Sequence, residues 1–143
     1  MRIGLDVTPA VRQGGGIGRY VRELLRALAQ TTPFADFRLF AASTLPLPHA
    51  LPPLPDNFSF RRLPFHDIWL ARLWGRLDVP LPVETLLGRL DVYHAPDFVL
   101  PPTLPGTRTL LTVHDLSFER DPASAAPGLL AYLKKVVPRS ARR

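Results

Sequence analysis

The chain has 143 residues, enough for one domain with a sizeable core, and its 46% hydrophobic and 21% charged residues are typical of a folded globular protein. It contains no cysteine, which excludes a disulfide scaffold, a cysteine-ligated metal centre and a cysteine nucleophile. The formal net charge of +6 lies mostly in the last ten residues, and such a terminal cluster does not favour a nucleic-acid partner.

The first elements are a strand, a glycine-rich turn and a helix. The short apolar run at residues 3–7 predicts a buried strand, which the following Thr-Pro pair ends. Glycines are dense at residues 13–18. From residue 17 to residue 28 the apolar side chains recur at the spacing of an amphipathic helix, and Thr-Thr-Pro at 31–33 ends it.

The middle of the chain is rich in proline. Residues 37–42 and 58–63 predict two strands, separated by a proline-rich loop at 46–55 that cannot hold regular structure. Residues 67–77 have helical spacing and carry two tryptophans and two arginines. This segment fits either core packing with solvated guanidinium groups or a membrane-facing amphipathic helix, and we expect core packing.

The remaining elements are short. Leucines at residues 86–90 predict a brief helix, and residues 91–95 and 109–113 predict two further strands. Pro127 opens a last helix at a position where proline is tolerated, and Pro138 is expected to kink or end that helix.

This order of elements predicts an α/β fold, namely a Rossmann-like, mainly parallel sheet with flanking helices in one domain over residues 1–143. The last helix reaches the end of the chain without a cap or a following strand, so we expect a truncated fold. No apolar run reaches about 18 residues and no signal peptide precedes the first strand, so we expect a cytoplasmic protein.

Ligands of open α/β sheets bind at the carboxyl ends of the strands, and the glycines at residues 14–18 follow the first strand. Glycines at a helix N-terminus suit a phosphate group, and the alternative interpretation is a tight turn that needs positive φ. The dinucleotide fingerprint G-x-G-x-x-G is not satisfied, because Arg19 or Val21 occupies its last position. NAD binding is therefore not expected.

Two histidines lie at strand ends as well. His94 closes the fourth predicted strand, and His114 follows the fifth. Each histidine can bond a ligand hydroxyl or phosphate oxygen, or it can cap its strand by bonding a main-chain carbonyl. His49 and His66 lie in loop segments and are expected to be solvated.

Two other kinds of site are poorly supported. The four residues His94, Asp97, His114 and Asp115 lack the spacing of a known metal-ligand set, so no metal is expected. No G-x-S-x-G elbow is present, so a serine hydrolase is not expected either.

Taken together, these residues resemble the N-terminal domain of glycosyltransferase family 4, retaining enzymes of the GT-B fold that use sugar nucleotides. The blocks that carry the resemblance are residues 1–6 (MRIGLD), 14–20 (GGGIGRY), 91–96 (DVYHAP), 112–118 (TVHDLSF) and the closing segment 132–143.

The resemblance implies a hexosyltransferase that needs no cofactor or metal and moves a sugar, with retention, from a UDP- or GDP-sugar donor to a glycan or lipid-linked acceptor in polysaccharide biosynthesis. Such enzymes are cytoplasmic and often peripheral to the inner membrane. His114 would be the catalytic residue, bonding a hydroxyl of the transferred sugar. The substrate-binding residues that the resemblance implies are Gly15, Gly16, Ile17, Gly18, Arg19, His94 and Asp115.

The chain departs from that family in lacking the C-terminal donor domain, with its Arg/Lys pair and Glu-x7-Glu motif. We therefore expect the acceptor-side half of an enzyme, with little or no transfer activity alone, because most stabilisation of the leaving diphosphate would be missing. Two alternatives stay open: a non-catalytic nucleotide- or glycan-binding α/β module, and another phosphate-binding α/β enzyme such as an epimerase.

Overall fold

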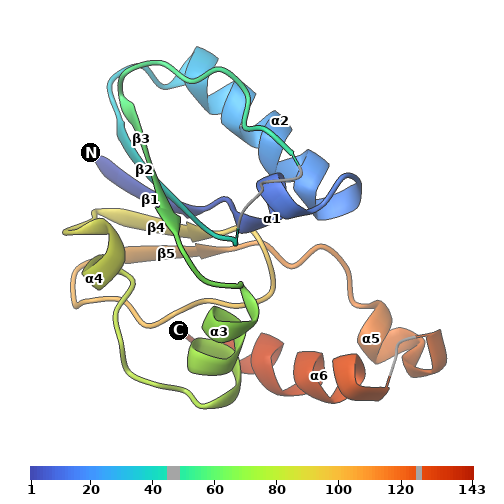
Figure 1. Ribbon diagram of the computed structural model, residues 1–143. Helices are drawn as coiled ribbons and strands as arrows, with labels where there is room; N and C mark the ends of the chain where they lie inside the picture. Colours follow the sequence, from blue (N-terminus) through green and yellow to red (C-terminus); the bar gives the residue numbers. More distant parts are fainter. Residues whose placement is uncertain (45–48, 125–126) are drawn as a thin grey trace.

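The computed structural model describes residues 1–44, 49–124 and 127–143. Five strands form one parallel sheet in the order β3-β2-β1-β4-β5 (Figure 1). The strands are β1 (Arg2–Asp6), β2 (Asp36–Ala42), β3 (Phe58–Leu63), β4 (Val92–Ala95) and β5 (Arg108–Leu111). The prediction of a Rossmann-like, parallel α/β fold is confirmed.

Short helices and two longer ones connect the strands or follow β5. They are α1 (Thr8–Arg12), α2 (Gly16–Thr31), α3 (Ile68–Leu70), the π-helix η1 (Ala71–Arg76), α4 (Glu84–Leu87), α5 (Ser117–Arg120), the 3₁₀ turn η2 (Pro122–Ser124) and α6 (Pro127–Ala141). Helices α1 and α2 cover one face of the sheet, and α3, η1, α4 and α6 lie toward the other face (Figure 1).

The alternation of side chains along the strands divides the core between the two faces. Leu5 and Leu39 are paired across β1 and β2 and pack with Val21 and Leu25 of α2. Phe40, the next residue of β2, belongs to the cluster on the opposite face. A third cluster joins α5 to α6. The sheet is therefore covered on both faces, as parallel sheets require.

The strand order positions the site. From β1 the chain first builds outward through β2 and β3, and it then returns to place β4 and β5 on the other side of β1. The order reverses between β1 and β4, where connecting segments diverge and leave a crevice at the carboxyl ends of the strands.

Three sequence predictions need correction. Thr8 and Pro9 do not simply end the first strand, because they begin α1, where proline at the first turn costs no hydrogen bond. The segment expected to be one helix at 67–77 is the short α3 followed by η1. Helix α6 continues through Pro138 to Ala141, since Pro138 lies on the exposed face, where water can bond the carbonyl that loses its partner.

The proline-rich loop expected at 46–55 lies partly outside the described residues, and its described part, 49–55, contains no helix or strand. Core packing is confirmed for Trp74, which is 3% exposed and donates its Nε1–H to the Leu81 carbonyl at 2.9 Å. Trp69 is 57% exposed, with the Arg72 guanidinium 5.1 Å above its ring. No helix in the described part of the chain is long and apolar enough to span a membrane.

Candidate functional site

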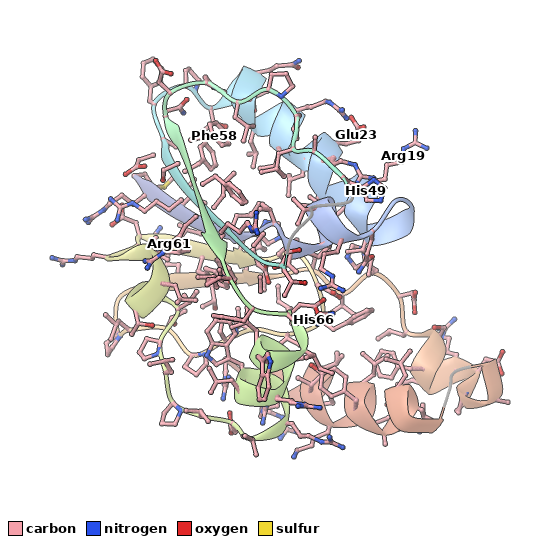
Figure 2. All side chains as sticks on the ribbon, viewed as in Figure 1. Arg19, Glu23, His49, Phe58, Arg61 and His66 are labelled. Carbon is pink, nitrogen blue, oxygen red and sulfur yellow. The ribbon has the colours of Figure 1, made fainter. Side chains whose placement is uncertain are left out.

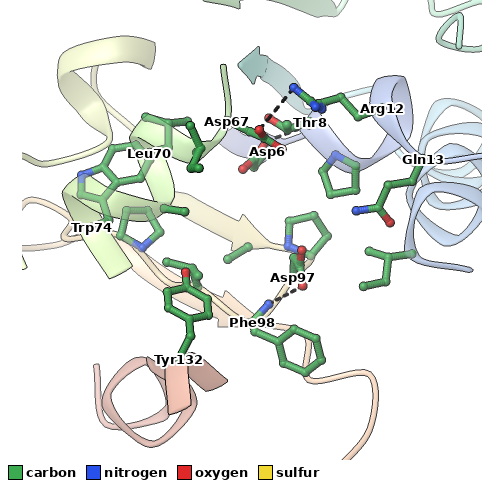
Figure 3. Close-up of a pocket in the computed structure, with 18 of the residues that line it drawn as sticks. Asp6, Thr8, Arg12, Gln13, Asp67, Leu70, Trp74, Asp97, Phe98 and Tyr132 are labelled. Atoms are coloured by element: carbon green, nitrogen blue, oxygen red, sulfur yellow. Dashed lines mark hydrogen bonds and ion pairs between the residues drawn. The ribbon is translucent and has the colours of Figure 1, made fainter. Parts of the chain in front are cut away.

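A pocket of about 610 Å³ opens at the carboxyl edge of the sheet, where the end of β1 meets the segment that follows β4 (Figure 3). This is the position at which the strand order reverses. Ligands of open parallel sheets bind in this crevice, and the volume falls within the range of about 300–1,000 Å³ typical of small-molecule sites. The pocket is therefore the candidate functional site.

Asp6, the last residue of β1, brings a carboxyl group into the pocket. Its Oδ1 accepts a hydrogen bond from the main-chain N–H of Thr8 at 2.8 Å, which fixes the first turn of α1 against the end of the strand. Burial raises the pKa of Asp6 to about 6, with the charges of Asp97 and Asp67 acting in the same direction and the Thr8 hydrogen bonds opposing them. The group therefore changes charge just below neutral pH.

Arg12, His66 and Asp67 form a polar cluster between α1 and the segment that precedes α3, and Figure 3 shows Arg12 and Asp67 of this cluster. The Arg12 guanidinium lies 3.2 Å from Oδ1 of Asp67 and 2.9 Å from Nε2 of His66. Because a guanidinium only donates, Nε2 of His66 is the acceptor of this bond, while Nδ1 lies 2.5 Å from the same Asp67 oxygen and 3.3 Å from the main-chain nitrogen of Ile68. The three side chains thus satisfy one another.

His49 and His66, which were expected to be solvated, are of intermediate exposure, and the His66 side chain is 45% exposed; Figure 2 shows where the two residues lie. The main-chain N–H of His49 bonds the Val11 carbonyl at 3.1 Å, and its ring lies beside Gly14. His66 reaches the pocket because the chain turns back toward α1 at the end of β3.

Asp97 and four aromatic residues supply another part of the wall. Burial raises the pKa of Asp97. Two smaller effects lower it: the main-chain N–H of Phe98 donates to Oδ1 at 2.8 Å, and His114 lies nearby. Burial and the charge of Asp97 also raise the pKa of Tyr132. The aromatic residues that line the pocket are Trp74, Tyr93, Phe98 and Tyr132.

The glycine segment forms the turn between α1 and α2. Gly15 and Gly16 are exposed, no atom lies within 4 Å of a Cβ built on either residue, and Gly16 has φ +46°. The interpretation as a turn that needs positive φ is confirmed at Gly16. Arg22 of α2 braces this turn, because its guanidinium donates to the carbonyl oxygens of Ala10, Gln13 and Gly14 at 2.6, 2.8 and 2.7 Å.

The other predicted residues of this segment have different surroundings. Gly18 is buried, and a Cβ at this position would lie 2.1 Å from the Gln13 carbonyl oxygen, so it is required by the close contact of α1 and α2. Ile17 lines the pocket. Arg19 projects from α2 (Figure 2), and its guanidinium has no hydrogen bond or ion pair within the described ranges.

His114 stands behind the wall of the pocket rather than on it. Its Nε2 lies 2.8 Å from the Pro96 carbonyl oxygen, and its ring makes edge contacts with Tyr20 and Phe98 at centroid distances of 5.2 and 6.0 Å. A carbonyl only accepts, so Nε2 carries the proton and Nδ1 is the nitrogen left for another partner. The Nε2 bond of His114 is therefore the one expected if the histidine caps its strand by bonding a main-chain carbonyl.

His94 and Asp115 are further from the pocket and do not line it. His94 is 7% exposed, its Nε2 lies 2.8 Å from Oγ1 of Thr112, and burial lowers its pKa to about 4. Asp115 is exposed and accepts hydrogen bonds from the main-chain N–H and the hydroxyl of Ser117, which lower its pKa and begin α5.

Sequence reasoning missed three contributors to the pocket, namely Asp6, Arg12 and Asp67, and it noted Asp97 only as a weak metal ligand. The rule that ligands bind at strand ends points to Asp6 and Asp97, because these residues end β1 and follow β4. Arg12 and Asp67 carry no such local signal, since they meet only when the segment after β3 packs against α1.

In the described part of the chain, no group of three or more histidine, cysteine, aspartate or glutamate side chains is arranged to hold a metal ion. Comparison of the chain with models of known protein families and with curated proteins found no match. A functional assignment therefore rests on the Rossmann-like fold and on the geometry of the pocket.

Proposed function

We propose that the chain is the N-terminal, acceptor-side domain of a retaining GT-B hexosyltransferase, which moves a sugar from a UDP- or GDP-sugar donor to a glycan or lipid-linked acceptor. The observation that carries the proposal is the position of the glycine segment beside the pocket. Ile17 lines the pocket, while Gly15 and Gly16 leave the main chain at the N-terminus of α2 exposed.

The two parts of the site suit two different substrates. The N-terminus of α2 presents the main-chain N–H groups of Gly16 and Ile17, which have no partner among the described residues, and the positive end of the helix dipole, and its first turn contains no acidic residue. This end of the helix suits the diphosphate of the donor, and the unpaired Arg19 adds a nearby positive charge. The pocket, with carboxyl groups and aromatic walls, suits the acceptor.

His114 has the proposed catalytic role of bonding a hydroxyl of the transferred sugar. Its Nε2–H is committed to the Pro96 carbonyl, so Nδ1 offers a lone pair to that hydroxyl. The Pro96 bond also fixes the plane of the ring, which pre-orients Nδ1.

A contact with the inner membrane belongs to the same proposal, because a lipid-linked acceptor is presented at the membrane surface. Trp69 is 57% exposed and pairs with Arg72, a combination that suits the boundary between lipid headgroups and acyl chains.

The test measures sugar transfer by the polypeptide translated from the complete reading frame, with UDP- and GDP-hexoses as donors and glycan and lipid-linked acceptors. We expect transfer with retention, and a loss of about tenfold in turnover for His114→Gln, as the loss of one hydrogen bond predicts. The glutamine can keep an N–H near the Pro96 carbonyl while it removes the ring Nδ1.

His114→Ala is the matched variant, since it loses both interactions and should also lower the free energy of unfolding by about 1 kcal/mol. Equal turnover of the wild type and His114→Gln would assign the histidine a purely structural role. Binding of sugars or nucleotides without transfer by the complete polypeptide would favour a non-catalytic module.

A further inference from the structure

The charged groups of the candidate pocket are unbalanced. Among the described residues that line it, three carboxyl groups face one guanidinium group, and no lysine is present. The carboxyl groups belong to Asp6, Asp67 and Asp97, and the guanidinium belongs to Arg12. An anionic ligand would therefore meet mostly like charges, in a site where aromatic walls reduce the screening by water.

The one cation of this lining is already engaged. Arg12 contacts Asp67 at 3.2 Å and donates to His66 at 2.9 Å, and the side chain is mostly buried against α1 and the segment after β3. Binding a phosphate through Arg12 would require this cluster to open and would leave Asp67 without its guanidinium partner. A free cation for an anion is therefore lacking in this part of the site.

Asp6 and Asp97, in contrast, keep capacity for a ligand. The Asp6 carboxyl accepts the main-chain N–H of Thr8 at 2.8 Å and a hydrogen bond from the Thr8 side chain, and the Asp97 carboxyl accepts the main-chain N–H of Phe98 at 2.8 Å. A carboxylate has about four acceptor positions, so each group can accept further hydrogen bonds. Figure 3 shows both side chains reaching the same cavity from β1 and from the segment after β4.

The remaining wall is apolar and aromatic. Trp74, Phe98 and Tyr132 line the cavity together with Ile17 and Leu70. A sugar ring combines these two requirements, because its C–H faces are apolar and its hydroxyl groups donate at the rim. A few placed polar groups within an apolar wall are the usual means of orienting a neutral ligand.

We propose that this pocket holds an uncharged sugar ring of the acceptor, with Asp6 and Asp97 accepting hydrogen bonds from its hydroxyl groups, and that it discriminates against phosphorylated sugars at this position. The inference rests on the proposed function and narrows its substrate class. Any phosphate of a lipid-linked acceptor then lies outside the pocket.

The test is a titration of the purified 143-residue chain, followed by the NMR signals of the Trp74 indole N–H and the Phe98 amide. The neutral probes are methyl α-glucoside, methyl α-mannoside and N-acetylglucosamine, and the anionic probes are their 6-phosphates. At about pH 7.5 Asp6, with a pKa of about 6, is mostly ionised. We expect at least one neutral sugar to shift both signals and its phosphate to bind about tenfold more weakly.

The variants Asp6→Asn and Asp97→Asn separate charge from shape. Each variant should bind the neutral sugar about tenfold more weakly, because a hydrogen bond to a charged group is lost. The affinity for the sugar phosphate relative to the affinity for the neutral sugar should rise. Asp56→Asn removes the same charge from an exposed residue before β3 and should change neither value.

The inference would be overturned if the wild type bound the sugar phosphate as tightly as the neutral sugar or more tightly. It would also be overturned if Asp97→Asn left the ratio of these two affinities unchanged. A lack of response at Trp74 and Phe98 to every sugar would overturn it too, even if the complete polypeptide transfers sugar. Neutral sugar binding as described, without transfer by the complete polypeptide, would instead overturn the proposed function and leave the selectivity of the pocket standing.

Discussion

The buried groups Asp6 and His94 should give the stability of the protein two opposite dependences on pH. Burial raises the pKa of Asp6 from 3.8 to about 6 and lowers that of His94 from 6.5 to about 4. The fold therefore disfavours the charged form of both groups, although one is an acid and the other a base.

The sign follows from proton binding. Between about pH 4 and pH 6 the folded state holds a proton on Asp6 that the unfolded state has lost, so the stability due to Asp6 falls as pH rises. Between about pH 6.5 and pH 4 the unfolded state protonates His94 while the folded state does not, so the stability due to His94 falls as pH falls. Each contribution amounts to up to about 3 kcal/mol, from about 1.4 kcal/mol for each unit of pKa.

The two slopes should largely cancel in the wild type, and single variants should reveal them. Asp6→Asn keeps an oxygen for the Thr8 N–H and leaves the slope of His94, so its free energy of unfolding should rise from pH 4 to pH 6 relative to the wild type. His94→Gln leaves the pH dependence due to Asp6, to which the smaller rise in the pKa of Asp97 adds. The free energy of unfolding of this variant should therefore fall from pH 4 to pH 6 relative to the wild type.

The assay is urea unfolding followed by tryptophan fluorescence at several pH values, with equal denaturant dependence confirming a common transition. The reasoning would be refuted if Asp6→Asn, His94→Gln and the wild type showed parallel pH profiles. It would also be refuted if the two variants diverged in the same direction.

Two further changes test the packing of the helices. Gly18→Ala should lower the free energy of unfolding by about 1–3 kcal/mol, because the new Cβ would lie 2.1 Å from the Gln13 carbonyl oxygen and 2.7 Å from that of Pro9. In the control variant Gly15→Ala the new Cβ meets no atom within 4 Å, so the free energy of unfolding should change by less than about 0.5 kcal/mol. Equal stabilities of these two variants in denaturant unfolding would show that α1 and α2 are not in close contact. Pro138→Ala should raise the midpoint of thermal unfolding by several degrees, since it restores a helical hydrogen bond on an exposed face of α6 and removes a penalty of up to about 3 kcal/mol. A lower midpoint would mean that Pro138 itself is needed for α6 to pack.

The sequence alone predicted the elements that are buried on a regular face. The local spacing of apolar residues predicted all five strands and the helices α2 and α6, because a strand or helix that packs on a core needs apolar side chains at a fixed spacing. The parallel sheet then follows from the alternation of strands and helices. Gly16 was also readable, because its positive φ needs a glycine.

Local patterns failed where irregular segments carry the structure. Helix α1 has only five residues, too few to show a period, and α5 is shorter still. The spacing of apolar residues in α2 gives no hint that the guanidinium of Arg22 binds three carbonyls of the turn before the helix. A side chain of this length can reach backbone that the helical periodicity does not describe.

The chemistry of the pocket was decided by tertiary structure. Arg12 and His66 are 54 positions apart in sequence and are 2.9 Å apart in space. The raised pKa of Asp6 likewise depends on burial beneath segments that come later in the chain. The periodicity of apolar residues predicts which face of a helix or strand is buried. Which polar groups meet at the end of the sheet depends instead on the paths of the loops, and these paths are determined only when the whole chain packs together.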